Sequence, residues 1–133
     1  MRRLAPESAA IELADIDSIP FFNADLNEVP ASVNTLKQQI EASDGVLIAT
    51  PEYNYGIPGV LKNAIDWVSR PAYASVLAQK PIGILGASPG PVGTARAQGQ
   101  RQTYFLFRNS RSVRRAISLD KRVRSRMNAC TRL

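Results

Sequence analysis

Two short, continuous apolar runs stand out in the pattern of hydrophobic and polar positions. Residues 45–50 read GVLIAT and residues 80–87 read KPIGILGA. Short continuous runs with β-branched residues are typical of strands buried on both faces of a parallel sheet. The pattern therefore predicts two inner strands of such a sheet.

An earlier segment predicts a further strand of a different kind. Residues 10–16, AIELADI, mix apolar residues with Glu12 and Asp15. Such a mixture favours a strand with an exposed edge or one solvated face. Residues 17–30 follow with several prolines, asparagines and aspartates, which indicates a loop.

Three stretches have the spacing of helices. Residues 33–43 place apolar side chains four apart, with Ser32 before them as the candidate N-cap. Residues 59–70 are amphipathic, and Pro58 lies near the first turn, where a missing N–H costs little. A third helix is expected to begin near Thr94.

The resulting order, β-α-β-α-β-α up to about residue 100, predicts an α/β domain with a parallel, doubly wound sheet. Loops 51–58 (PEYNYGIP) and 88–94 (SPGPVGT) follow the two apolar strands. Ligands of open α/β sheets bind at the carboxyl ends of strands, so these loops are the candidate site. An aromatic wall beside a glycine-rich backbone suits a planar heterocycle with imide edges.

Residue types alone leave other interpretations open. PEYNYGIP also fits a structural loop whose tyrosines only cover the sheet edge. Glu52 fits a solvated or paired carboxylate better than a general base. Trp67 fits the core or a subunit interface better than a cofactor contact. Arg96 fits an exposed helical position, with the binding site or a partner subunit as alternatives.

Composition excludes several kinds of chemistry. The 133 residues, enough for one domain, contain no histidine and one cysteine, Cys130. Ser-His and Cys-His catalysis, histidine-ligated metals, cysteine clusters and an internal disulfide are therefore excluded, and we expect no metal site. A lone cysteine fits a reduced, cytoplasmic setting. No apolar run approaches the ~18–20 residues that span a bilayer, so we expect no membrane partner.

The charge is unevenly distributed. Residues 1–100 carry seven basic and ten acidic residues, whereas residues 101–133 carry ten basic residues and one acidic residue. This change predicts a core at 1–99 and an arginine-rich tail at 100–133. The tail's aromatic residues cluster at one end instead of interleaving with arginines, so we expect no specific nucleic-acid partner, while non-specific polyanion binding stays open.

The segment PEYNYGIPGVLKNAIDW resembles the flavin-contacting segment of the NADPH-dependent FMN reductases, a flavodoxin-like family that includes quinone and chromate reductases. ADIDSIPFFNADL and ILGASPGPVGTARAQ resemble the segments that flank it. The resemblance covers about residues 10–98. It implies a flavodoxin-like, three-layer parallel sheet that is incomplete at both ends.

The resemblance also implies a site and its cofactors, FMN and NAD(P)H. Electrons would pass to a quinone, flavin or similar small acceptor, and the family assembles as homo-oligomers. The flavin carries the chemistry, so no catalytic side chain is predicted. One group of residues would border the isoalloxazine ring and another its pyrimidine side: Pro51, Glu52, Tyr53 and Asn54, and then Ser88, Pro89, Gly90 and Gly93.

Both ends depart from the family pattern. The family opens with a strand and a phosphate-binding loop, which the sequence from Met1 does not contain. That strand is central in the order 2-1-3-4-5, so residues 10–16 must pair with 45–50 or stay unpaired. One hypothesis covers both ends, a late start and a frameshift near 99–103 in a reductase gene. The alternative function is a non-catalytic remnant that binds a subunit or a polyanion.

Overall fold

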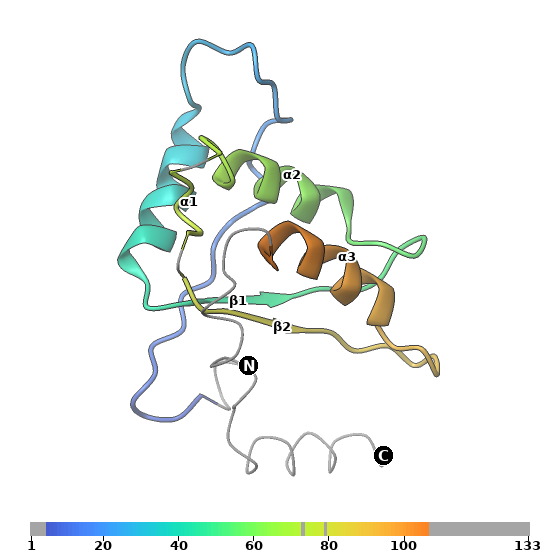
Figure 1. Ribbon diagram of the computed structural model, residues 1–133. Coiled ribbons are helices and arrows are strands. Elements are labelled where there is room, and N and C mark those ends of the chain that lie inside the picture. The colour runs from blue at the N-terminus through green and yellow to red at the C-terminus, as the bar shows by residue number, and fades with distance from the viewer. Residues whose placement is uncertain (1–4, 73, 79, 107–133) are drawn as a thin grey trace.

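The computed structural model describes residues 5–72, 74–78 and 80–106. Within them, helices and strands alternate along the chain (Figure 1). The elements are α1 (Ala31–Ala42), β1 (Val46–Ala49), α2 (Gly59–Val68), β2 (Ile82–Leu85) and α3 (Ala95–Leu106).

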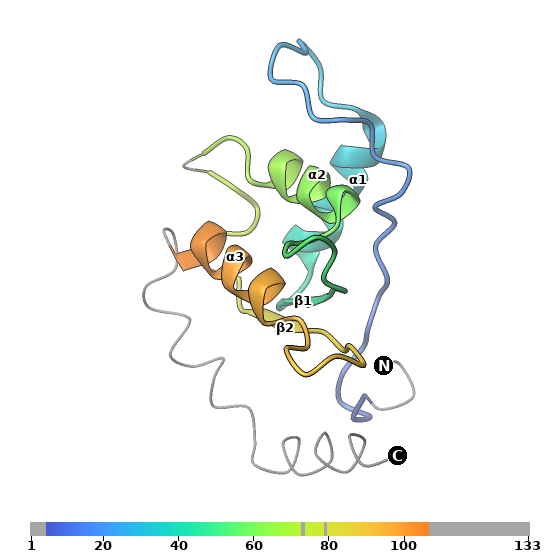
Figure 2. The same cartoon turned by 90° about the vertical axis from the view of Figure 1, so that its right-hand side faces the viewer.

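The two strands pair in parallel, as the sequence predicts. Val46 lies opposite Ile82 and Ala49 lies opposite Leu85. The helices lie on one side of this sheet in both views (Figures 1 and 2). Successive side chains of a strand point to opposite faces, and Val46 and Ile82 pack against the core. Leu47, on the other face, is 50% exposed. The prediction of strands buried on both faces is therefore wrong for this part of the chain, since no described helix covers the second face.

The core lies between α1, α2 and the loop segments beside them. Apolar side chains spaced three and four apart turn one face of each helix inward, which is why these sequences form packed helices. The buried cluster consists of Ile19, Val33, Leu36, Ile40, Ala64, Trp67, Val68 and Leu77.

The predicted strand at residues 10–16 is wrong. This segment has no strand structure, and the one strand paired with β1 in the described residues is β2. A strand exists only where a neighbour satisfies its backbone N–H and C=O groups. Residues 10–16 therefore do not pair with residues 45–50 and, within the described part of the chain, stay unpaired, which is the second of the two expected outcomes. The Gln39 amide holds this segment to α1 by donating to the Glu12 carboxylate at 2.6 Å.

The predicted N-cap Ser32 is also wrong. Helix α1 begins at Ala31, and its N-cap is Pro30, without a side-chain capping hydrogen bond. The Pro30 carbonyl accepts from the Asn34 N–H at 3.0 Å, which places Ser32 in the first turn. Helix α2 begins at Gly59 as predicted and ends at Val68, two residues earlier than predicted.

Asn63 on α2 fastens the loop of residues 17–30 to the core. The Phe22 N–H donates to Asn63 Oδ1 at 2.7 Å, and Asn63 Nδ2 donates to the Pro20 carbonyl at 2.9 Å. One amide side chain therefore satisfies a donor and an acceptor of an otherwise irregular segment.

We expect Asn63→Ala to lower the free energy of unfolding by about 1–2 kcal/mol, because it leaves the Phe22 N–H without its partner. Urea unfolding followed by far-UV circular dichroism measures the loss. Asn34→Ala is the control, since the exposed Asn34 amide only donates to the Val29 carbonyl at 3.2 Å. Equal losses for the two variants would contradict the anchoring role.

Candidate functional site

Both candidate loops begin at the same edge of the sheet. The last residues of β1 and β2 are paired, and the Thr50 N–H donates to the Leu85 carbonyl at 3.0 Å. Segments 50–58 and 86–94, called the loop pair below, therefore leave the sheet side by side at its C-terminal edge (Figure 1). This confirms that the two predicted loops are neighbours.

Gly86 allows the loop pair to pack closely. A Cβ atom at this position would lie 2.6 Å from the Thr50 carbonyl oxygen and closer still to Thr94 Oγ1. Thr50 and Thr94 are each 3% exposed, so neither has room to move away. Only glycine lets the end of β2 pass between the end of β1 and the start of α3. Gly86 is not among the eight predicted site residues; its signal in the sequence is a glycine directly after a strand.

A tight hairpin displays the two tyrosines of the first loop. Tyr53 and Gly56 exchange two backbone hydrogen bonds of 3.0 Å each. Asn54 and Tyr55 between them have φ angles of 49° and 66°, the conformation of a type I′ turn. The Tyr53 and Tyr55 side chains are 62% and 72% exposed. A positive φ is rare for tyrosine, and such strain concentrates at functional sites.

Glu52 caps helix α3. Its Oε2 atom accepts from the backbone N–H groups of Arg96 at 3.0 Å and Ala97 at 3.1 Å. Its Oε1 atom lies 3.5 Å from the Arg96 guanidinium, and its side chain is only 12% exposed. The interpretation of Glu52 as a paired carboxylate is confirmed. Because the carboxylate occupies these N–H groups, the start of α3 is not free to bind a phosphate.

Two further contacts join the first loop to α3. The Arg96 guanidinium lies 4.5 Å from the centroid of the Tyr55 ring, a cation–π contact. The Ile57 N–H donates to Gln100 Oε1 at 3.0 Å. Arg96 is thus an exposed helical residue with two defined partners.

The second loop is shaped by its glycines. Ser88 Oγ accepts from the Gly90 N–H at 3.1 Å, and the Gly93 N–H donates to the Gly90 carbonyl at 3.1 Å. Gly93 has a φ of 61°, which favours glycine. Ser88, Pro89 and Gly90 are exposed at the surface of this loop.

The structure therefore brings the eight predicted residues to one sheet edge but gives them different surroundings. Pro51, Tyr53 and Asn54 are exposed on the first loop, whereas the Glu52 carboxylate faces α3. Exposed aromatic rings beside an exposed, glycine-rich backbone fit the stacking and hydrogen-bonding needs of an isoalloxazine ring. This edge fits the ring end of FMN.

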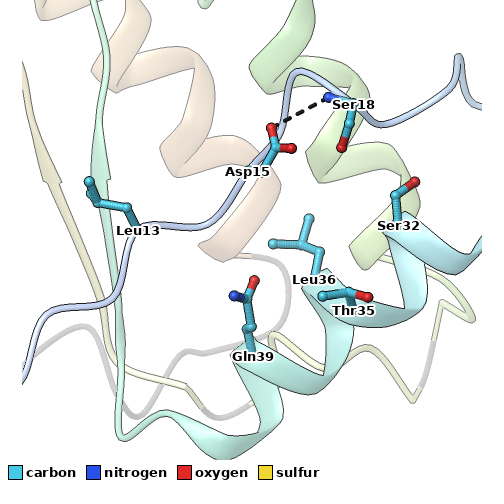
Figure 3. A pocket seen from close by; sticks show the side chains of 7 residues that line it. All are labelled: Leu13, Asp15, Ser18, Ser32, Thr35, Leu36 and Gln39. Carbon is cyan, nitrogen blue, oxygen red and sulfur yellow. Dashed lines mark hydrogen bonds between the residues drawn. The ribbon is translucent and has the colours of Figure 1, made fainter.

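A cavity away from this edge is lined by residues of the N-terminal segment and α1. It has a volume of about 330 Å³ and lies between the N-terminal segment and α1 (Figure 3). The Ser18 hydroxyl, together with the backbone N–H groups of Asp17 and Ser18, holds the pKa of Asp15 below its usual value. None of the residues that line this cavity belongs to the loop pair. The lining residues are Leu13, Asp15, Ser18, Ser32, Thr35, Leu36 and Gln39.

Two negative findings hold for the described residues. They contain no group of three or more His, Cys, Asp or Glu side chains that could hold a metal ion. Among them, no helix is both long and apolar enough to cross a membrane.

Parallel strands joined through α2, with the candidate site at their C-terminal ends, are typical of an open α/β protein such as a flavodoxin-like one. The flavoenzyme FerB from Paracoccus denitrificans, an NAD(P)H:(acceptor) oxidoreductase, has a similar solved structure with a TM-score of 0.67 and 44% sequence identity. The similarity covers 72% of this chain and 53% of FerB. The predicted flavodoxin-like α/β fold is therefore confirmed, while the described residues form two of the three predicted layers.

The chain belongs to the NADPH-dependent FMN reductase family, whose model matches residues 1–123. The sequence motifs indicate a resemblance over about residues 10–98, so the family model matches a longer part of the chain. An NAD(P)H-dependent FMN reductase of Pseudomonas aeruginosa is 50% identical over 78% of this chain and 57% of its own length. A quinone reductase of Escherichia coli is 44% identical over 79% of this chain and 57% of its own length.

Family membership confirms the predicted family and its cofactors, FMN and NAD(P)H. The chain spans little more than half the length of these relatives.

Proposed function

We propose that this chain binds FMN at the loop pair and transfers electrons from NAD(P)H to a quinone or a similar small acceptor. The observation that carries the proposal is the pair of exposed tyrosines, Tyr53 and Tyr55, held on a hydrogen-bonded hairpin beside an exposed glycine-rich loop. The bound flavin supplies the hydride chemistry. The names of the relatives, an FMN reductase and a quinone reductase, support the same activity.

In this proposal the residues of the chain bind and orient the ring. Pro51, Tyr53 and Asn54 form the wall beside the ring. Ser88, Pro89 and Gly90 offer backbone groups to its pyrimidine side. Glu52 fastens the first loop to α3, and Gly93 closes the turn of the second loop by donating to the Gly90 carbonyl.

Three further parts of the proposal concern the chain as a whole. Residues 1–99 form the flavin-reductase core and residues 100–133 an arginine-rich tail, whose first residues continue α3 and place Gln100 against the first loop. The chain forms homo-oligomers with the flavin sites near the subunit boundary. The lone Cys130 fits a reduced, cytoplasmic setting.

The flavin content of the purified full chain tests the proposal. We expect FMN to be retained, or taken up on addition, in a near-stoichiometric amount, with NADPH oxidation that depends on an added quinone. Visible flavin absorbance after ultrafiltration and a coupled NADPH assay measure the two properties. A protein that stays colourless with FMN and oxidises no NADPH would contradict the proposal and favour the non-catalytic binding module.

Tyr53→Ala is expected to weaken FMN binding by about tenfold, because stacking on an aromatic side chain contributes roughly 1–3 kcal/mol. Titration of FMN fluorescence gives the dissociation constant. Phe21→Ala is the matched control, since Phe21 is 91% exposed and lies outside the loop pair. If both variants bind FMN as tightly as the wild type, Tyr53 is not part of the ring wall.

A further inference from the structure

We infer that Glu52 is a positioning residue of the proposed flavin site, which fastens the Tyr53–Gly56 hairpin to the N-terminus of α3, with Arg96 fixing the Tyr55 ring in the same contact. The inference deepens the proposed function and rests on it for the ligand. The anchoring itself concerns only contacts within the chain.

Glu52 directly precedes Tyr53, and its carboxylate accepts hydrogen bonds from backbone N–H groups 44 and 45 residues further along the chain. Hydrogen bonds to a charged acceptor are among the stronger ones, and this carboxylate is nearly buried. A displacement of Glu52 therefore displaces the hairpin that follows it.

The hairpin is strained, because Asn54 and Tyr55 both have positive φ angles. Such backbone conformations persist only where the surrounding structure holds them. Besides the hairpin's own two hydrogen bonds, the described residues hold the loop to α3 through Glu52, Arg96 and Gln100.

The Arg96 guanidinium lies over the Tyr55 ring at 4.5 Å from its centroid and 3.5 Å from Glu52 Oε1. The Glu52 carboxylate thus positions the Arg96 guanidinium, and the guanidinium positions the Tyr55 ring. With the guanidinium over one face, the exposed remainder of the ring is what a planar ligand meets.

The test begins without any ligand. Amide hydrogen exchange of the full chain, read by NMR, reports on Tyr53 and Gly56 in the hairpin and on Arg96 and Ala97 in the cap. We expect Glu52→Ala to speed exchange at these amides by about tenfold or more, since the charged acceptor is lost. Glu52→Gln keeps an acceptor oxygen and is expected to restore most of the protection. Unchanged exchange in Glu52→Ala would overturn the anchoring.

Asp66→Ala is the control for the loss of one carboxylate. Asp66 pairs with Lys62 within α2 and lies outside the loop pair. We expect the four amides to keep their wild-type exchange rates in this variant. Faster exchange there, equal to that in Glu52→Ala, would mean that general destabilisation explains the effect and would overturn the inference.

A second variant keeps the inference testable if Glu52→Ala does not fold. Arg96→Ala removes the ring contact but keeps both backbone hydrogen bonds to Glu52. We expect the NMR resonances of the Tyr55 ring to shift, while the backbone amides of residues 96 and 97 stay protected from hydrogen exchange. Unchanged Tyr55 resonances would overturn the role of Arg96.

FMN titration separates this inference from the proposed function. We expect Glu52→Ala to raise the FMN dissociation constant by about tenfold and Glu52→Gln to recover most of the affinity. Faster exchange with unchanged FMN affinity would overturn the link to the flavin. A wild-type chain that binds no FMN would count against the proposed function, while the exchange experiment would still decide the anchoring.

Discussion

Gly86→Val is expected to lower the free energy of unfolding by about 3 kcal/mol or more and to abolish the packing of the loop pair. Its Cβ atom would lie 2.6 Å from the carbonyl oxygen of Thr50, a backbone atom that does not rotate away. Overpacking of a tight core site costs about 1–3 kcal/mol, and more when backbone must shift. The branched valine adds two methyl groups to a site that does not admit the first carbon.

Thermal and urea unfolding of the full chain, followed by far-UV circular dichroism, measure this loss. Gly99→Ala is the matched control, because a Cβ atom on this α3 glycine would meet nothing within 4 Å. An alanine inside a helix is expected to stabilise by about 0.5–1 kcal/mol relative to glycine. A Gly86→Val chain as stable as the wild type would show that the close approach at Thr50 does not constrain the fold.

The sequence predicts the strands and helices whose buried apolar residues follow a regular spacing over a few residues. The continuous apolar runs of β1 and β2, and the apolar faces of α1 and α2, are visible in windows of a few residues. The neighbouring position of the two loops then follows from parallel pairing, because both loops leave carboxyl ends of adjacent strands. The eight predicted residues therefore gather at one edge without any knowledge of side-chain contacts.

The features that the sequence did not reveal depend on partners far along the chain. Residues 10–16 have the composition of a strand but pair with no strand among the described residues, and composition alone does not report a strand's partner. The cap on α3 comes from Glu52, whereas a local search for caps considers only adjacent residues. Asn54 fits a positive φ, but Tyr55 gives no such signal, so the type I′ turn becomes visible only in the backbone.

Trp67 lies in the core, apart from the candidate site. Trp67 is 5% exposed, and its ring packs edge-to-face on Phe22 with centroids 5.0 Å apart. Its Nε1 atom donates to the Pro20 carbonyl at 2.8 Å. Of the two positions expected for Trp67, the core and a subunit interface, the structure shows the core. Trp67 joins α2 to the N-terminal segment, which has no strand pairing of its own.

We expect Trp67→Ala to lower the free energy of unfolding by about 3–5 kcal/mol, because it leaves a large cavity beneath Phe22. Trp67→Phe keeps a ring in the site and loses the hydrogen bond, so a smaller loss of about 1–2 kcal/mol is expected. Far-UV circular dichroism during urea unfolding compares the variants, since Trp67 is the only tryptophan of the chain and its fluorescence is lost with it.

Val60→Ala on the same helix is the control, because Val60 is 40% exposed and its replacement is expected to change stability by no more than about 0.5 kcal/mol. The ordering Ala, then Phe, then wild type separates the ring packing from the hydrogen bond. Equal stability of Trp67→Ala and Val60→Ala would contradict the core position of Trp67. A stable Trp67→Ala chain with a changed oligomeric state would favour the interface instead, since only burial against a partner explains that outcome.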